Sequence, residues 1–533
     1  MFGLRSFWKC VGSLSVLSAF TCLPSAVAGQ DMKSGGCSRE TLCVGWDAAP
    51  RTVDPRYVGT DALSLALEPL LFLPLVGFSQ DGKATEVLAE SITQSEPTVV
   101  DVRLREGIRF AMGRVVSADD VVATYRFLRF GTPRLPSSPR RAFLEKVKSI
   151  EKVSERQLRF VMAEPDASFC SRLTAGILPK EALERSPEDI FGLGFESGPF
   201  VRESIAGTEW TLKRNEKFTG APFGGRMPSL ARVVFKFSAE SSSLLAALEK
   251  NEVDLVQNAL PAEDVAKFKN SPSLGYEVQT TGTDSTAVLA LNLRNKIFQD
   301  VRVRRAIALA IDREEILKFT LKGFGTVADS FFPEFSPFFM KNESPIRFHP
   351  REAEILLDAA GLKDPDGSSG PRTRAALSIQ VPLERERVEV AKAIAAQLQK
   401  VGFKVTVEVL EFTDFLKRVN SGKAQMWVAP WTGLRDDEHL RNVFHSKSVP
   451  PLGANRTYYA NTKLDELLDK AKGEVKTEAR KALYTQAQTL ILRDFPCVFL
   501  WHGVGHAVIN KSVSGYRIFP DGGLVSLTQV MKH

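Results

Sequence analysis

Stretches with strand-type alternation and stretches with helix-type periodicity follow one another along most of this 533-residue chain. Alternation of apolar and polar residues predicts β-strands at 99–105, 156–163, 209–215, 231–237 and 403–412. Helical periodicity predicts amphipathic helices at 118–128, 241–250, 303–311, 388–402 and 465–492. Ser117 is the expected N-cap of the first of these helices, because two aspartates follow in its first turn. Such interleaving is typical of an α/β protein, and the length suffices for two or three hydrophobic cores.

The first 28 residues have the features of a secretory signal peptide. Two basic residues precede the apolar stretch 11–23, which is too short for a membrane anchor, and the small-residue pattern at 26–28 marks a cleavage site. We therefore expect export and a mature chain that begins near Gly29. The alternative is a lipoprotein anchored through Cys22, which is disfavoured because Phe20 is too bulky for the lipid-attachment motif.

The charge distribution excludes one class of partner. The formal net charge is +7, and it falls to +5 when the signal is removed, because the signal contains Arg5, Lys9 and no acid. The basic runs at 302–305 and 139–141 are short. Nucleic-acid binding needs a longer basic stripe with interleaved aromatic residues. We therefore expect no nucleic-acid partner.

Four cysteines remain after the signal is removed. Cys37 and Cys43 lie close together in a polar segment, and in an oxidising compartment they could close a small disulfide loop. Cys170 and Cys497 lie in apolar contexts, where a buried, inert thiol is expected. The sequence shows no spacing typical of a metal site, so we expect no metal and no cofactor.

The motifs that would indicate an enzyme are incomplete. HGVGH at 502–506 has two histidines four residues apart but lacks the glutamate of the zinc-protease motif. Gly503 and Gly505 disfavour the helix that would bring both imidazole rings to one metal ion. No Gly-x-Ser-x-Gly nucleophile motif is present either. We therefore predict a binding protein, with a secreted hydrolase as the most distant alternative.

A set of ordered motifs carries a family resemblance. The motifs are VDP (53–55), EPL (68–70), DGKATEVLAES (81–91), VRLREGIRFAMGRVVSADDVVATY (102–125), ILPKEAL (177–183), SGPFV (197–201), LKRNEKF (212–218), EVDLV (252–256), LALNLRNKIFQDVRVRRAIALAIDREEI (289–316) and AEILLDAAGL (353–362). In this order the chain resembles the extracytoplasmic solute-binding proteins of ABC importers in the oligopeptide, dipeptide and nickel group, family 5. Most of these matches are turn glycines and apolar helix positions, which identify a fold and not a ligand.

The resemblance implies a two-lobed periplasmic binding protein of the Venus-flytrap type, class II or cluster C, with an extra N-terminal subdomain. The expected parts are a signal at 1–28, lobe I at 29–58 with 186–284 and 508–533, an inserted subdomain at 59–185, and lobe II at 285–507. Two strands are expected to cross between the lobes near 285–292 and 500–507. A monomer of this kind closes on its ligand by a hinge motion, and an ABC permease in the inner membrane recognises the closed form.

The segment WTGLRDDEHL at 431–440 lies where peptide-binding members have Trp-x-x-Asp in the cleft. The resemblance implies that Trp431, Thr432 and Gly433 contact an extended ligand, the main chain by pairing as an added strand. Leu434 occupies the position of the aspartate that binds the ligand's amino terminus. Loss of such a buried partner costs roughly 2 to 5 kcal/mol. Either the ligand lacks a free amino terminus, or Asp436 or Asp437 replaces the aspartate; a solvated turn at this pair is the alternative.

Other candidate ligand contacts come from the same resemblance. Thr60 and Asp61 lie in the N-terminal segment that faces the cleft in relatives, and Asn292 ends the first crossing strand; a loop cap or a strand-end turn is the alternative for each. Arg385 and Arg387 lie near the place where dipeptide-binding relatives have an arginine for the ligand's carboxylate. A further tryptophan, at position 427, is either a pocket wall or strand core, and core is favoured.

The function expected from these observations is the reception of a peptide or peptide-like ligand for import. Within the same fold, a nickel or haem chelate is the alternative ligand. A protein that presents its ligand to a receptor without transport is the alternative of another class.

Overall fold

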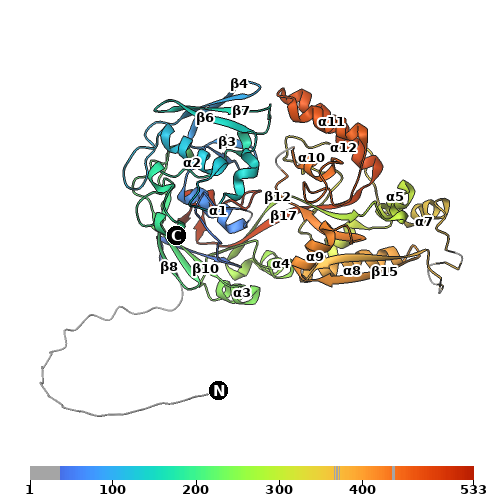
Figure 1. Cartoon of the computed structure of the whole chain (residues 1–533). Coiled ribbons are helices and arrows are strands. Elements are labelled where there is room, and N and C mark those ends of the chain that lie inside the picture. The colour runs from blue at the N-terminus through green and yellow to red at the C-terminus, as the bar shows by residue number, and fades with distance from the viewer. Residues whose placement is uncertain (1–36, 60, 365, 368–369, 371, 435–437) are drawn as a thin grey trace, which may run out of the picture. The chain divides into compact units, whose positions relative to one another are not determined.

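The structure is a computed structural model that describes residues 37–533 except 60, 365, 368–369, 371 and 435–437. Its largest element is an 11-stranded mixed sheet (Figure 1). Ten strands lie in the order β15 (Phe403–Leu410), β14 (Ala375–Pro382), β16 (Met426–Trp431), β12 (Tyr276–Leu291), β17 (Cys497–Asn510), β11 (Leu255–Gln257), β1 (Thr41–Trp46), β10 (Arg232–Phe237), β9 (Glu209–Arg214) and β8 (Phe200–Ala206), and β13 (Thr326–Val327) pairs with β17.

Two long antiparallel strands, β12 with 16 residues and β17 with 14, carry the sheet from one hydrophobic core to the next. Their register shifts between Gly282 and Thr286. On one side of this shift, Tyr276 packs in a cluster with α3 (Ser241–Glu249) and α4 (Ala262–Asn270). On the other side, β12 residues from Ala287 onward pack in two different clusters. These strands therefore run from the hydrophobic cluster of one lobe into the two clusters of the other.

The first lobe contains the largest hydrophobic cluster. It joins one end of the large sheet to a separate four-stranded sheet and to two helices. The separate sheet has the strand order β4 (Ala89–Glu96), β5 (Val99–Leu104), β7 (Gln157–Met162) and β6 (Val147–Ser154). The two helices are α1 (Ala62–Leu71) and α2 (Ala118–Phe130). Two small sheets pair β2 (Val76–Phe78) with β3 (Ala84–Glu86) and β18 (Val513–Ser514) with β19 (Met531–Lys532).

The second lobe covers both faces of its sheet with helices. Alternation along β16 sends Met426 into one cluster and Trp427 into the other, because successive side chains of a strand point to opposite faces. The first face packs against α5 (Val301–Leu309), α6 (Arg313–Phe319), α7 (Pro350–Ala359) and α8 (Arg385–Gln399). The second packs against α9 (Phe412–Asn420), α10 (Glu438–Phe444), α11 (Thr462–Gly473) and α12 (Thr477–Asp494).

The secondary structure agrees with the sequence at each predicted strand and differs in one helical segment. The periodic stretch 465–492 contains parts of two helices, α11 and α12, instead of one. Glu474 has extended backbone angles, and its N–H donates to the carbonyl of Ala471, which ends α11. Gly473 and the β-branched Val475 at this break both have low helix propensity, which apolar periodicity alone does not register.

The cysteines are arranged largely as the sequence suggested. Cys37 and Cys43 form a disulfide, with Cα atoms 6.1 Å apart. Cys497 is a buried free thiol, but Cys170 is only partly buried, at the surface of its cluster. Burial raises the pKa of both free thiols, so neither is poised as a thiolate.

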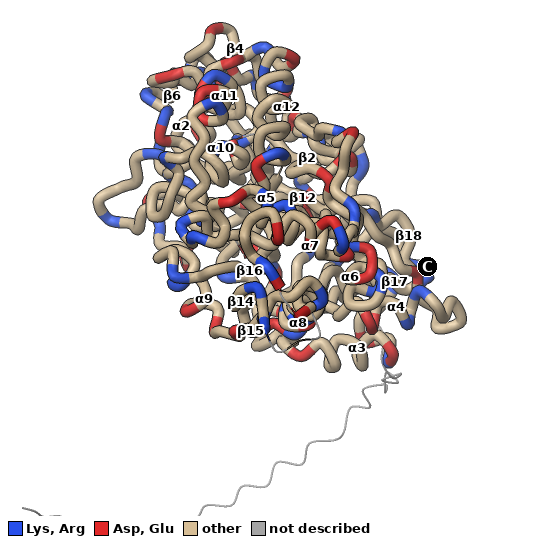
Figure 2. Tube along the Cα trace, turned by 90° about the vertical axis from the view of Figure 1, so that its right-hand side faces the viewer, with Lys and Arg blue, Asp and Glu red and all other residues tan. Residues whose placement is uncertain are grey.

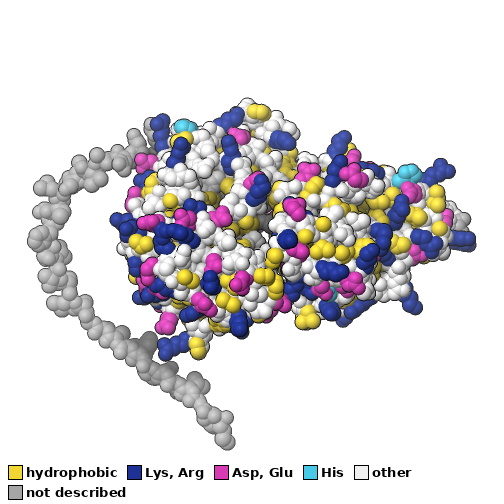
Figure 3. Space-filling view, turned by 90° about the horizontal axis from the view of Figure 1, so that it is seen from above, with side chains coloured by type: hydrophobic (Ala, Val, Ile, Leu, Met, Phe, Trp, Pro, Cys, Tyr) yellow, Lys and Arg dark blue, Asp and Glu magenta, His cyan; other side chains and the backbone are white. Residues whose placement is uncertain are grey.

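Charged side chains of both signs are interspersed over the surface. Figure 2 shows acidic and basic residues alternating along the trace, and the face in Figure 3 carries no continuous basic stripe. Among the described residues, none of the helices combines the length and the apolar character needed to span a bilayer.

Candidate functional site

The candidate site lies at the carboxyl edge of the second lobe's sheet. Strands β14, β15 and β16 are parallel, so Pro382, Leu410 and Trp431 end at the same edge. Helix α8 begins at Arg385, just beyond β14. The crevice outside the carboxyl ends of parallel strands is where open α/β sheets generally bind ligands. The fold therefore brings the segment at Trp431 and the arginines of α8 to one edge.

Trp431 is the last residue of β16 and pairs with Thr286 on the crossing strand β12. Its half-buried ring packs against the second-face cluster. Thr432 is exposed, and Gly433 has φ of +76°, a left-handed conformation that favours glycine. The chain thus leaves the strand ladder at Trp431 and turns sharply two residues later.

Leu434 faces the protein interior. Its side chain has 0% exposure and belongs to the second-face cluster, and its N–H donates to the carbonyl of Asp284 at 2.9 Å. The Leu434 side chain therefore packs in the core, and its backbone hydrogen bond holds the end of the Trp431–Gly433 turn against β12. The side chain offers no surface to a ligand. Asp436 and Asp437, like Thr60, lie outside the described residues.

Asp61 caps a helix. Its carboxylate accepts from the N–H groups of Leu63 at 3.2 Å, Ser64 at 3.4 Å and Arg51 at 2.8 Å, and from the hydroxyl of Ser64. These bonds satisfy the first turn of α1 and tie the preceding segment to it. The carboxylate is therefore committed to the loop-cap arrangement.

Asn292 closes a turn at the end of β12 and is 5% exposed. Its Nδ2 donates to the carbonyls of Gly422 at 2.9 Å and Ala424 at 2.8 Å, and its Oδ1 accepts from the N–H of Arg294 at 3.1 Å. The side-chain amide is fully used by the main chain. This is the strand-end turn of the sequence interpretation.

The two arginines of α8 differ in their surroundings. Arg385 is exposed at the first helical position. Arg387 is partly buried, and its Nε lies 2.8 Å from a carboxylate oxygen of Glu384. Arg387 is therefore already neutralised by an acid of its own helix start. Trp427 is 2% exposed in the second-face cluster, which confirms the core interpretation.

One arginine beside Trp431 was not identified from the sequence. The guanidinium carbon of Arg456 lies 5.5 Å from the centre of the Trp431 ring, and Nε donates to Oδ1 of Asn420 at 2.7 Å. Burial lowers the pKa of Arg456. The sequence could have drawn attention to Arg456 in one way, because no aspartate or glutamate occurs between Glu438 and Asp465 that could pair with it locally.

The two histidines of HGVGH lie on strand β17, not on a helix. Nδ1 of His502 and the hydroxyl of Thr286 are 2.8 Å apart. Burial lowers the pKa of both His502 and His506 to about 4. Within the described residues, the group of potential metal ligands that lies close together is Cys37, Cys43 and Asp254, and its two sulfurs are joined as a disulfide. The histidines are structural residues of a crossing strand.

Comparison with known proteins identifies the family. Residues 83–449 match the model for bacterial extracellular solute-binding proteins, family 5 Middle. The chain belongs to family 5. Di/tripeptide-binding protein 2 of Pseudomonas aeruginosa (strain UCBPP-PA14) is 28% identical over 523 residues, which cover 90% of this chain and 93% of that protein. Oligopeptide-binding protein AppA of Bacillus subtilis (strain 168) is 26% identical over 548 residues, which cover 96% of this chain and 97% of AppA.

Solved structures show the same architecture. AppA from Bacillus subtilis in complex with a nonapeptide superposes with a TM-score of 0.72 at 25% identity, covering 94% of this chain and 99% of that chain. NikA from Brucella suis in complex with Fe(III)-EDTA gives a TM-score of 0.81 at 20% identity, covering 92% and 100%. The two-lobed α/β fold expected of a family 5 protein is confirmed.

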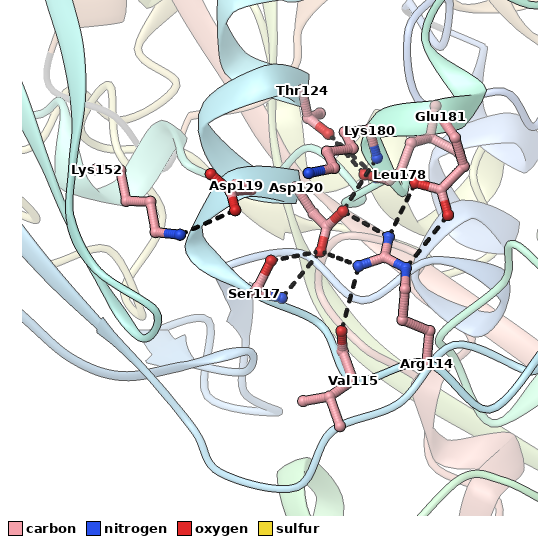
Figure 4. Close-up of polar contacts among 10 residues, drawn as sticks. All are labelled: Arg114, Val115, Ser117, Asp119, Asp120, Thr124, Lys152, Leu178, Lys180 and Glu181. Carbon is pink, nitrogen blue, oxygen red and sulfur yellow. Dashed lines mark hydrogen bonds and ion pairs between the residues drawn. The ribbon is translucent and has the colours of Figure 1, made fainter.

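The most specific family 5 motif, 102–125, builds a structural network in the first lobe (Figure 4). Arg114 forks between Asp120, with Nη2 to Oδ1 at 2.6 Å, and Glu181 at 3.2 Å. The carboxylate of Asp120 also accepts from the N–H groups of Ser117 at 2.9 Å and Lys180 at 3.0 Å. The groove of about 470 Å³ beside these residues is therefore lined by charges that are largely used internally. The motif caps α2 and positions it, which explains why it identifies the fold.

An ion pair joins the two lobes away from the crossing strands. Nζ of Lys472, near the end of α11, lies 3.1 Å from Glu164 just after β7. Lys146 approaches the same carboxylate at 3.7 Å. The hydrogen bond from Lys472 is the main cause that lowers the pKa of Glu164. The ion pair therefore connects α11 with the segment that follows β7 of the four-stranded sheet.

Proposed function

We propose that this family 5 protein is the periplasmic substrate-binding component of an ABC importer. It is exported through a cleaved signal peptide, binds a peptide or peptide-like ligand in the cleft between its lobes as a monomer, and delivers the ligand to the permease. The observation that carries the proposal is the turn at Thr432 and Gly433, which leaves the strand ladder at the carboxyl edge beside the crossing strands. The names of the relatives, which specify di- and tripeptides and oligopeptides, support this ligand class.

In the proposed complex an extended ligand pairs with the main chain of Thr432 and Gly433, as an added strand pairs with an open edge. Trp431 forms the wall of one side-chain pocket. Asp436 or Asp437 receives a positive end of the ligand, since Leu434 is buried. Arg385 is available at the same edge.

The lobes in this proposal have the limits expected from the sequence, with lobe II at 285–507 and the inserted subdomain at 59–185. The change of hydrophobic cluster along β12 and β17 supports a hinge at the crossing strands. Thr60, Asp61 and Asn292 border the cleft in this arrangement, and Asp61 and Asn292 act by holding their turns.

A thermal-shift and calorimetric titration of the mature protein tests the proposal. The panel contains peptides of two to nine residues, nickel with histidine, and haem. A bound peptide at 100 times its Kd raises the free energy of unfolding by about 2.7 kcal/mol. Trp431→Ala should abolish this effect while leaving the unligated protein folded, and the surface variant Arg302→Gln should not change it. Stabilisation by a chelate alone would replace the peptide assignment, and no stabilisation by any panel member would contradict it.

A transport test separates import from ligand presentation. Deletion of the cognate permease should abolish uptake of the bound peptide. If the phenotype of the binding protein persists without the permease, a receptor-coupled role is correct instead.

A further inference from the structure

The end of α2 and the segment that follows it combine exposed aromatic rings with a long acid-free stretch. The 24 residues from 121 to 144 contain five arginines and no aspartate or glutamate. Phe130, the last residue of α2, is 51% exposed, and Phe143 in the 3-10 helix η1 (Pro139–Leu144) is 59% exposed. The residues that define this α2–η1 surface are exposed or partly exposed: Phe130, Phe143, Arg126, Arg129, Arg134 and Arg141.

The two parts of the α2–η1 surface are held together by the fold. Helix η1 packs against α2. The guanidinium carbon of Arg129 lies 5.2 Å from the centre of the Phe130 ring, and its Nη2 donates to the carbonyl of Glu145, two residues after Phe143, at 2.7 Å. Arg140 fastens η1 from below, because it is buried and forms an ion pair with Glu68 of α1. The exposed rings therefore project from a fixed framework.

The arginines of the α2–η1 surface are not neutralised by the protein. Arg126 donates to the carbonyl of Ile150 at 2.8 Å, and Arg129 donates to main-chain carbonyls as well, so both keep their full positive charge. In the part of the chain that the structure describes, no ion pair joins either of them, Arg134 or Arg141 to an acid.

Exposed arginines in the second lobe are arranged differently. Arg302 forms an ion pair with Asp300 at 2.6 Å, and Arg305 forms one with Glu352 at 3.0 Å. Glu145, the acid that ends the acid-free stretch, offers its carbonyl to Arg129, and its own side chain is exposed. The α2–η1 surface therefore has an excess of positive charge beside two apolar rings.

We propose that the α2–η1 surface binds an anionic lipid bilayer, with the two phenylalanine rings in the headgroup region and the arginines on lipid phosphates. Aromatic side chains enter the interface between headgroups and acyl chains, and basic residues are attracted to anionic lipids. Charge complementarity favours this occupant, because a bilayer presents many phosphates that arginines at separate positions can contact at once.

This inference goes beyond the proposed function. The α2–η1 surface contains none of the residues of the candidate site, and its binding to lipid needs no bound peptide. A weak attachment of this kind would keep a binding protein close to the membrane that holds its permease.

Co-sedimentation of the mature protein with lipid vesicles tests the proposal. The vesicles contain about 30% phosphatidylglycerol in phosphatidylcholine, and vesicles of phosphatidylcholine alone are the reference. The wild type should bind the anionic vesicles, and added salt should weaken the binding. No binding to anionic vesicles at low salt would overturn the proposal and leave an acidic protein surface as the occupant. Binding that inorganic phosphate abolishes at constant ionic strength would overturn it in favour of a site for free anions.

A pair of arginine variants separates this surface from the general positive charge of the protein. Arg134→Gln combined with Arg141→Gln should weaken vesicle binding by about 25-fold, at roughly fivefold for each cation. Its control combines Arg351→Gln with Arg372→Gln, which removes the same charge from exposed positions of the second lobe. The control should bind nearly as the wild type does. Equal losses in the two double variants would overturn the proposal, because binding would then follow net charge alone.

A second pair of variants tests the aromatic rings. Phe130→Ser combined with Phe143→Ser should weaken binding by at least about fivefold, since the apolar area that enters the bilayer is lost. Its control combines Phe319→Ser with Phe348→Ser, which changes two exposed rings elsewhere and should not affect binding. The melting temperatures should stay near that of the wild type, because all four rings are exposed. Unchanged vesicle binding in Phe130→Ser with Phe143→Ser would contradict the entry of the rings into the headgroup region.

Discussion

Replacing His502 should make the protein less sensitive to acid. His502 is 7% exposed on the crossing strand β17, and burial lowers its pKa to about 4 from 6.5. The folded protein therefore holds this imidazole neutral, whereas the unfolded chain takes up a proton as the pH falls below 6.5. The contribution of His502 to the free energy of unfolding is therefore fully present above pH 6.5 and is lost as the pH falls from 6.5 to 4. The difference between a pKa of 6.5 in the unfolded chain and about 4 in the folded protein, at about 1.36 kcal/mol for each pKa unit, corresponds to a loss of about 3 kcal/mol of stability.

Urea unfolding between pH 7.5 and 4 measures this effect. In the wild type, His502 contributes a slope of about 1.4 kcal/mol per pH unit in the lower part of that range. His502→Asn should remove this contribution, whatever its own stability at pH 7.5, because the slope and not the absolute value reports the proton. His533→Gln, which changes an exposed terminal histidine, is the control and should keep the wild-type slope. An unchanged slope in His502→Asn would refute the argument that the buried imidazole is neutral.

Two further variants and one chemical reduction test other parts of the structure. Leu434→Ala should lower the free energy of unfolding by about 2 to 5 kcal/mol, since the leucine is fully buried; a loss of ligand affinity without loss of stability in urea unfolding would mean that the side chain contacts the ligand. Reduction of the Cys37–Cys43 disulfide should cost about 2 kcal/mol, the entropy of a short loop, measured by unfolding with and without a reductant; equal stability would contradict a structural role. Glu164→Gln should weaken ligand binding by no more than about fivefold, because the ion pair with Lys472 is partly exposed. Calorimetry should show that the difference in affinity from the wild type becomes smaller at high salt. A difference that does not depend on salt would argue against an electrostatic contact between the lobes.

The secondary structure could be predicted from the sequence because local periodicity and burial agree. Strand β5 alternates buried and exposed residues as its sequence does, and α2 begins at the cap expected at Ser117. The break between α11 and α12 was missed because both helices bury residues in the same cluster, so the apolar period continues across the junction.

The site could be predicted only in part. The position of Trp431 followed from the family motif, and the structure places it at the carboxyl edge. The burial of Leu434 depends on long-range packing against residues far away in the sequence. Arg456 lies 25 positions beyond Trp431, and its relation to that ring arises from the folding of the second lobe.

The proposed function requires that this family 5 protein hold a peptide or peptide-like ligand in the cleft between its lobes. Native mass spectrometry of the protein purified gently from a periplasmic extract tests it most directly, with release and sequencing of whatever remains bound. We expect short peptides or peptide-like molecules, which Trp431→Ala should lose and Arg302→Gln should retain. A single bound species that is a metal chelate or an uncharged non-peptide would contradict it.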